Sequence, residues 1–230
     1  MDTNSKYRGK REMESFSSLN IQKAKSPNIK YNVEIKEMVF YDFITSCLDL
    51  IVALIGLIIT LPVILLVGIL IKIEDNGPVF YKQERMGKDG KHFWIYKLRS
   101  MKIDAEKYGM QWAEKDDTRI TKIGKFIRKT RIDELPQLIN IINGDMKLIG
   151  PRPERPELTM QFNEVTPGFI NRLVVKPGMT GWAQVNGGYD ISHEEKLELD
   201  IYYINNRSMW MDIQILCQTI RVVLTGDGAR

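Results

Sequence analysis

The sequence predicts a mostly helical α+β protein that begins with a membrane-embedded helix–break–helix segment, and three observations lead to this expectation. A run of apolar residues from Leu50 to Ile71 contains no charge. The stretch that follows has the pattern of a small β-hairpin, and amphipathic segments separated by turns make up the rest of the 230-residue chain. We expect a disordered polar tail over 1–36, a re-entrant membrane helix over 37–75, and a cytosolic-face domain with interfacial amphipathic helices over 76–230.

The composition excludes several classes of protein. Hydrophobic residues make up 43% of the chain and charged residues 27%, which rules out a collagen-like or wholly disordered chain. The net charge of +4 is too small to indicate nucleic acid as a partner. With only His92, His193, Cys47 and Cys217, a multi-histidine metal centre or a cysteine-rich zinc site is excluded. Both cysteines lie in apolar sequence, so we expect buried, reduced thiols.

The apolar run is long enough to reach through a bilayer. Its 22 residues would form a straight helix of roughly 33 Å, against a hydrocarbon core of about 30 Å. A buried core helix is disfavoured because runs of this length seldom occur in soluble cores. Pro62 lies near the middle and should kink the helix, and both flanks are basic, so charge does not choose an orientation. These features favour a helix that enters and returns over one that crosses.

The elements after this run are shorter. Residues 78–81 and 93–96 are apolar around Asp89-Gly90, which predicts a β-hairpin with a tight turn. Residues 104–118 are highly charged, and we expect a loop or an exposed helix there. Ile120 to Arg131 has an apolar and a basic side, which fits either a membrane-interface helix or a solvated face over a core. Met209 to Leu224 is apolar nearly all round and predicts a helix buried in the domain or against lipid.

Two adjacent carboxylates, Asp133 and Glu134, follow the basic segment. We expect Asp133 to be the N-cap of a helix that tolerates Pro136 in its first turn and ends at Asn143-Gly144. A carboxylate at a helix N-terminus near Arg and Lys stays ionised, as a nucleophile or metal ligand requires. The structural alternative is a capped helix with an acidic first turn.

Other patterns indicate anion binding. In Gly150-Pro151-Arg152-Pro153 two prolines fix the backbone around an arginine, which suits a rigid phosphate clamp or a plain surface turn. Lys97 and Arg99 are further phosphate candidates, or exposed strand cations. The segment from Lys176 to Gly188 is rich in Gly and Pro and predicts an ordered binding loop. Asp116-Asp117 is a weak indication of a metal pair.

From about Asp42 to Arg230 the ordered blocks of this chain resemble the bacterial sugar transferases, the monotopic polyprenyl-phosphate phosphoglycosyl transferases that start exopolysaccharide, capsule and glycan assembly. The resemblance depends on the joint order of six blocks, namely the Pro-interrupted apolar segment, Tyr96–Met101, Arg131–Leu138, Asn143–Met146, Gly150–Pro153 and Lys176–Trp182. It implies a re-entrant helix and a catalytic domain on the cytoplasmic face of a bacterial cell membrane, with UDP-sugar, undecaprenyl (polyprenyl) phosphate and membrane lipids as partners and Mg²⁺ as cofactor. It implies no nucleic acid and leaves a homodimer open.

The resemblance also implies residue roles. Asp133 is the expected nucleophile, which attacks the β-phosphate of the UDP-sugar, releases UMP and forms a phosphosugar–aspartate that polyprenyl phosphate then attacks. Glu134 is the expected catalytic Mg²⁺ ligand, and Lys97 and Arg152 are the expected phosphate contacts. Four further residues carry over as substrate-binding candidates, namely Arg99, Arg119, Arg128 and Asp145.

Two departures accompany the resemblance. Many members have Ser-Pro where this chain has Leu61-Pro62, so a hydroxyl that could bond the freed backbone is missing here. Many have Arg where it has Gly188, so sugar preference should differ if that Arg contacts the sugar nucleotide in relatives. Two other functions compete with the implied one. A conventional glycosyltransferase with a lipid acceptor would release UDP, and a membrane adaptor would have no turnover. The sequence does not identify the sugar.

Overall fold

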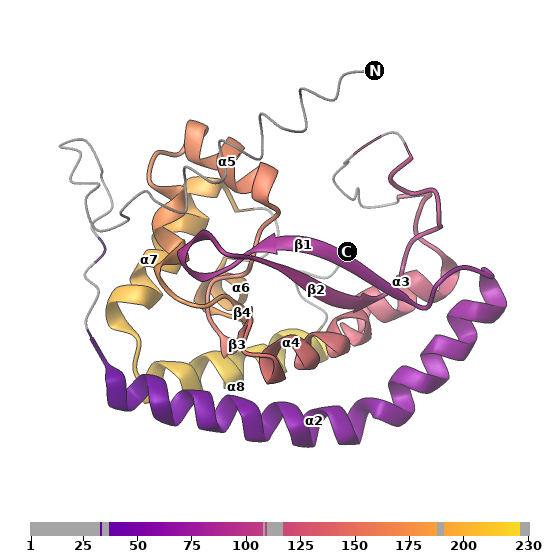
Figure 1. Ribbon diagram of the computed structural model, residues 1–230, viewed down its shortest axis with the longest axis horizontal. Coiled ribbons are helices and arrows are strands. Elements are labelled where there is room, and N and C mark those ends of the chain that lie inside the picture. Colours follow the sequence, from indigo (N-terminus) through magenta and orange to yellow (C-terminus); the bar gives the residue numbers. More distant parts are fainter. Residues whose placement is uncertain (1–32, 34–36, 108, 110–116, 188–190, 226–230) are drawn as a thin grey trace.

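The computed structural model describes residues 33, 37–107, 109, 117–187 and 191–225. It confirms a mostly helical α+β fold with one long apolar helix and a small antiparallel hairpin (Figure 1). The predicted tail over 1–36 lies outside the described residues apart from Val33, as do Asp116 and Gly188.

Helix α2 (Val39–Glu74) forms the base of the molecule and curves along the rest of the fold (Figure 1). It has 36 residues and continues through Pro62, so one curved helix stands where a break was predicted (Figure 1). A proline removes only one backbone hydrogen bond, and packing on both sides of it keeps the helix together. Within the described residues, α2 is the one helix long and apolar enough to cross a membrane.

One stripe of α2 faces the domain along the whole helix. Near its N-terminus, the Tyr41 hydroxyl donates to Asp212 Oδ2 at 2.6 Å. Ala53 packs in the middle against Ile95 and Leu138, and the C-terminal half joins a cluster made of Ile64, Val67, Ile71, Leu98 and Ile127. Most other apolar side chains of α2 are exposed. Both ends of the helix therefore contact the same folded body.

Strands β1 (Phe80–Met86) and β2 (His92–Leu98) form the predicted antiparallel hairpin, with Met86 opposite His92. A short 3₁₀ turn, η2 (Lys88–Gly90), connects them, and both Asp89 (φ 56°) and Gly90 (φ 74°) have the positive φ that such a tight turn requires. The Asp-Gly prediction is confirmed. A second, parallel pair joins β3 (Lys147–Ile149) to β4 (Gly178–Thr180).

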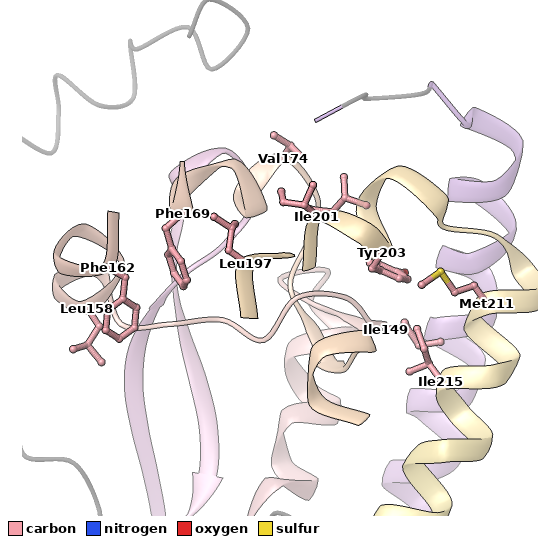
Figure 2. Close-up of a cluster of buried hydrophobic side chains, with 11 residues drawn as sticks. Ile149, Leu158, Phe162, Phe169, Val174, Leu197, Ile201, Tyr203, Met211 and Ile215 are labelled. Carbon is pink, nitrogen blue, oxygen red and sulfur yellow. The ribbon is translucent and has the colours of Figure 1, made fainter. Parts of the chain in front are cut away.

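The remaining elements are short helices, namely α3 (Lys122–Lys129), η3 (Ile132–Gln137), α4 (Leu138–Ile142), α5 (Pro156–Val165), η4 (Phe169–Val174), α6 (Trp182–Asn186), α7 (His193–Asn206) and α8 (Met209–Thr225). The largest buried cluster extends from Leu158 and Phe162 on α5, past Phe169 and Leu197, to Ile215 on α8 (Figure 2). This core packs α7 against the end of β3, next to the loop that follows this strand.

The structure distinguishes between the alternatives for two amphipathic segments. In the segment from Ile120 to Arg131, which contains α3, Ile120 and Ile127 are buried, whereas Phe126 is 59% exposed. The apolar side of this segment is therefore divided between the core and the outside. On α8, only Met211, Asp212 and Ile215 are buried. The apolar side chains exposed on its outer face include Trp210, Ile213, Leu216, Ile220 and Leu224. Helix α8 therefore has both a domain-facing side and an open apolar side.

The expectation of buried cysteines is wrong. Cys47 on α2 and Cys217 on α8 are both exposed. Their apolar surroundings in sequence reflect helix faces that point away from the domain, so an apolar neighbourhood along the chain does not here mean a protein core.

Candidate active site

The adjacent carboxylates lie in the first turn of η3, directly after an unusual backbone conformation. Arg131 has φ 58° and ψ 13°, in the left-handed region, and occupies the N-cap position of η3 without a side-chain capping bond. The prediction that Asp133 is the N-cap is therefore wrong, because the helix begins earlier, at Ile132. A non-glycine residue in this region costs roughly 1–2 kcal/mol, and such strain tends to occur at functional sites.

Glu134 is the centre of an ion-pair cluster assembled from three segments. Its Oε1 lies 2.7 Å from Nζ of Lys97 on β2. Arg152, in the loop after β3, contacts both carboxylate oxygens, Oε1 through Nη2 and Oε2 through Nη1 at 3.3 Å. This fork is the geometry in which Arg binds a carboxylate or phosphate most strongly. Glu134 itself is only 7% exposed.

The two carboxylates of the dyad have opposite pKa shifts. Burial would raise the pKa of Glu134, but Arg152 and then Lys97 outweigh it and hold the pKa well below its ordinary range. Burial raises the pKa of Asp133, Lys97 opposes that shift, and the charge of Glu134 adds to it. Nearby cations thus dominate the pKa of Glu134, whereas burial dominates that of Asp133.

Asp133 has a different environment from Glu134. It is 6% exposed, and within the described part of the chain no side-chain hydrogen bond or ion pair reaches it. Arg128, Lys97 and Arg152 are near enough to lower its pKa by their charge. A buried carboxylate beside cations, without a direct partner, is suited to react with an anionic phosphorus centre.

The other three predicted substrate-binding residues contact partners elsewhere. Arg99 donates to the Asp75 carbonyl at 2.7 Å, at the end of α2. Arg119 pairs with Asp117 at 2.6 Å, and Asp145 accepts a bond from Asn140 Nδ2 at 3.2 Å. The structure therefore brings together Asp133, Glu134, Lys97 and Arg152, with Arg128 close by.

Sequence reasoning missed several residues around the site. Arg85, Arg172, Glu154 and Asp200 surround the loop that carries Arg152, and their partners lie far away in sequence. Gln137 ends η3 and is 1% exposed, and its amide nitrogen has no hydrogen-bond partner among the described residues. No local pattern marks any of them, because their environment arises only from tertiary contacts.

The carboxylates of the dyad are the hard oxygen ligands that Mg²⁺ prefers. Within the described residues, no group of three or more His, Cys, Asp or Glu side chains forms a complete metal cage. Mg²⁺ commonly uses one or two carboxylates together with substrate phosphates and water. The residues present therefore fit an ion that arrives with a phosphate substrate.

The model of a family described as bacterial sugar transferase matches residues 40–226. The UDP-N-acetylgalactosamine-undecaprenyl-phosphate N-acetylgalactosaminephosphotransferase of Aeromonas hydrophila is 47% identical over 193 residues, which cover 83% of this chain and 46% of the relative. The chain thus spans about half the length of that relative.

Two further relatives have related names. The putative undecaprenyl-phosphate N-acetylgalactosaminyl 1-phosphate transferase of Bacillus subtilis (strain 168) is 59% identical over 133 residues, covering 58% of this chain and 74% of the relative. The UDP-glucose:undecaprenyl-phosphate glucose-1-phosphate transferase of Escherichia coli (strain K12) is 38% identical and covers 75% of this chain and 38% of the relative.

Proposed function

The chain belongs to the bacterial sugar transferase family, and from this premise we propose that it transfers a sugar 1-phosphate from a UDP-sugar to undecaprenyl phosphate at the cytoplasmic face of a membrane. The observation that carries this proposal is the buried dyad, in which Lys97 and Arg152 hold Glu134 while no described side chain bonds directly to Asp133. The names of two relatives support N-acetylgalactosamine as the first sugar to test.

The proposed reaction has two displacements at one phosphorus atom. A carboxylate oxygen of Asp133 attacks the β-phosphorus of the UDP-sugar, and the bond from this phosphorus to the oxygen shared with the α-phosphate breaks. UMP leaves with that oxygen, and the sugar phosphate stays bound to Asp133. An oxygen of undecaprenyl phosphate then attacks the same phosphorus and expels the carboxylate, which yields undecaprenyl diphosphate sugar and the original enzyme.

The main obstacle to this reaction is the electrostatic repulsion between a carboxylate and a diphosphate, and the cations of the site reduce it. Lys97 and Arg152 already bracket the neighbouring Glu134, so they are placed to take up phosphate charge as it develops. Burial raises the pKa of Asp133, and the charges of Lys97 and Arg128 oppose that rise and so favour its ionised, nucleophilic form. When bound, Mg²⁺ held by Glu134 and substrate oxygens would neutralise further phosphate charge.

We further propose that α2 is re-entrant. It contacts one folded body through Tyr41 at its start and Ile71 near its end, whereas a crossing helix would carry one end to the far side of the bilayer. The test replaces both native cysteines and introduces a single one at Glu37 or Asn76, which are exposed residues flanking the helix. We expect an impermeant reagent to label neither position in intact cells and both after permeabilisation. Labelling of only one in intact cells would establish a crossing helix.

The function is tested with the protein in lipid vesicles, a panel of UDP-sugars and undecaprenyl phosphate. We expect UMP release, a phosphosugar adduct on Asp133, and a loss of turnover of roughly 1,000-fold or more in Asp133→Asn, because an amide is a poor nucleophile. Asp89→Asn, at the exposed hairpin turn, is the control and should keep wild-type turnover. Release of UDP would indicate a conventional glycosyltransferase. Zero turnover with every UDP-sugar would favour a membrane adaptor.

A further inference from the structure

We propose that the buried ion pair between Arg172 and Asp200 is a positioning device that holds Arg152, through its backbone, in place to bind phosphate. This inference rests on the proposed function, because it assigns Arg152 to the phosphates of the substrate. Arg172 and Asp200 lie behind Arg152 and are therefore positioning residues, which act on the reaction through Arg152.

The Arg172 guanidinium connects two elements and the loop after β3. From η4 it pairs with Asp200 Oδ2 on α7, through Nη2 at 2.6 Å and Nε at 2.9 Å. The same Nη2 donates to the backbone carbonyl of Arg152 at 2.8 Å. Both side chains of the ion pair are 2% exposed, and the guanidinium lies 4.9 Å from the centre of the Phe169 ring. Its orientation is fixed on all of these sides.

In the loop from Pro151 to Glu154, each of the four backbone carbonyls accepts a hydrogen bond. Gly178 N–H donates to Pro151 at 3.0 Å, Arg85 donates to Pro153 at 2.9 Å, and Met86 N–H donates to Glu154 at 2.9 Å. The Arg172 bond to the Arg152 carbonyl completes the set. Because the two prolines have no N–H to donate, these acceptor bonds are the main backbone restraint on the loop.

Two charged side chains on one face of helix α7 support this loop, one directly and one through Arg172. Lys196 and Asp200 are one helical turn apart, and Lys196 pairs with the Glu154 carboxylate while Asp200 holds Arg172. A capping box at Ser192 and Glu195 fixes the start of α7. Helix α7 therefore supports the loop that carries Arg152 through two separate ion pairs.

A buried ion pair is weak evidence for a role in stability alone. Well-packed apolar residues often stabilise a core as much, because both charges lose their hydration when buried. The ion pair fixes the direction of the Arg172 guanidinium, and this places an N–H donor at the one position where the Arg152 carbonyl can accept it. Arg152 is thus held at both ends, by Arg172 at the backbone and by Glu134 at the guanidinium.

A double-mutant cycle on the full-length protein in vesicles tests this inference. The variants are Arg172→Lys, Arg152→Lys and the pair together, and the measured quantities are the dissociation constant for UDP, by calorimetry, and kcat/KM for UMP release. A lysine at 172 can serve Asp200 or the Arg152 carbonyl but lacks the fork that serves both. We expect Arg172→Lys to weaken UDP binding about tenfold alone and by less than about twofold in the Arg152→Lys background.

The outcomes separate positioning from stability and from the proposed function. Equal effects of Arg172→Lys in both backgrounds would show that it acts independently of Arg152 and overturn the inference, as would unchanged UDP binding in Arg152→Lys. Arg207→Lys alters a similar pair with Asp42, at the start of α2, and should leave UDP binding unchanged. Because UDP binding needs no turnover, a protein that releases no UMP would refute the proposed function while the cycle still reports on Arg172.

Discussion

Asp133 and Glu134 are neighbours in sequence, yet their environments separate their properties. Glu134 is held by Lys97 and by the fork of Arg152, whereas Asp133 is buried and has no direct side-chain partner in the part of the chain that the structure describes. Pairs of acids whose surroundings move their pKa values apart are typical of sites that divide two roles between two carboxylates. Here Glu134 has direct cation partners and Asp133 is governed by burial, and the proposed function uses this difference by giving the covalent step to Asp133.

The charge of Glu154 makes a contribution to stability that depends on pH. Lys196, Arg172 and Arg85 overcome the effect of burial and lower the pKa of Glu154 from 4.5 to about 2. A depressed pKa stabilises the fold above the unfolded value, and this contribution disappears as pH falls from about 4.5 towards 2. We expect Glu154→Gln to reduce the free energy of unfolding by roughly 3 kcal/mol at pH 7 and by much less near pH 3.

Unfolding of the wild type and of Glu154→Gln in detergent between pH 7 and pH 3 measures the difference in their free energies of unfolding. Glu157→Gln alters an exposed carboxylate on the same stretch of chain and should have little effect at any pH. A gap between wild type and Glu154→Gln that stays constant with pH would contradict the assignment.

Two buried amides three residues apart offer a second comparison. Asn140 is wholly buried, and its amide group donates to the Trp94 carbonyl at 2.7 Å and accepts from Tyr96 N–H at 3.1 Å, which ties α4 to β2. Gln137 is equally buried, but its amide nitrogen has no partner among the described residues. We expect Asn140→Leu to lower the free energy of unfolding by about 2–3 kcal/mol and Gln137→Met to leave it unchanged or raise it by about 1 kcal/mol.

Chemical denaturation of the two variants in the same detergent tests this contrast, with each serving as the control for the other. Equal destabilisation would mean that Gln137 has a partner as strong as those of Asn140, which the described contacts do not provide.

At the scale of elements, the shape of α2 decides how the molecule meets the bilayer. As a straight helix, its 36 residues would measure about 54 Å, far more than the roughly 30 Å of a hydrocarbon core. Helix α2 is curved (Figure 1), and both of its halves contact the same domain, through Tyr41 on one side of Pro62 and Ile71 on the other.

We expect Pro62→Ala to straighten α2, because residue 62 then donates to the Ile58 carbonyl and the proline ring no longer crowds the preceding turn. One end of the helix should then leave the domain. In the labelling assay this appears as a fraction of molecules that react at position 37 from outside the cell, and in unfolding as a melting temperature lower by several degrees. Leu61→Ala, at an exposed neighbour, should change neither quantity. Wild-type labelling and stability in Pro62→Ala would show that packing alone bends the helix.

The sequence was informative where a local pattern determines local structure. Asp89-Gly90 specified the hairpin turn, and the apolar run specified the long helix. It failed where distant segments meet. The left-handed Arg131 displaces the helix start from Asp133, and no propensity predicts that conformation for an arginine. Arg99 could equally have belonged to the cluster of Lys97, but the end of α2 engages it. The Arg172–Asp200 pair joins residues 28 apart, beyond any periodic pattern.

The whole molecule exposes apolar side chains on two helices that are joined by the Tyr41–Asp212 bond. Cys47 lies on the exposed part of α2 and Cys217 on that of α8, so the native thiols report on both surfaces. If both surfaces face lipid, each thiol in vesicles should react with a water-soluble maleimide at least roughly tenfold more slowly than a cysteine at Lys88, which is exposed near the hairpin turn, and should react readily with a lipid-soluble maleimide. Variants that retain one thiol each separate the signals. Fast reaction of Cys217 with the water-soluble reagent, beside a protected Cys47, would place the outer face of α8 in water and leave α2 as the only inserted element of the described structure.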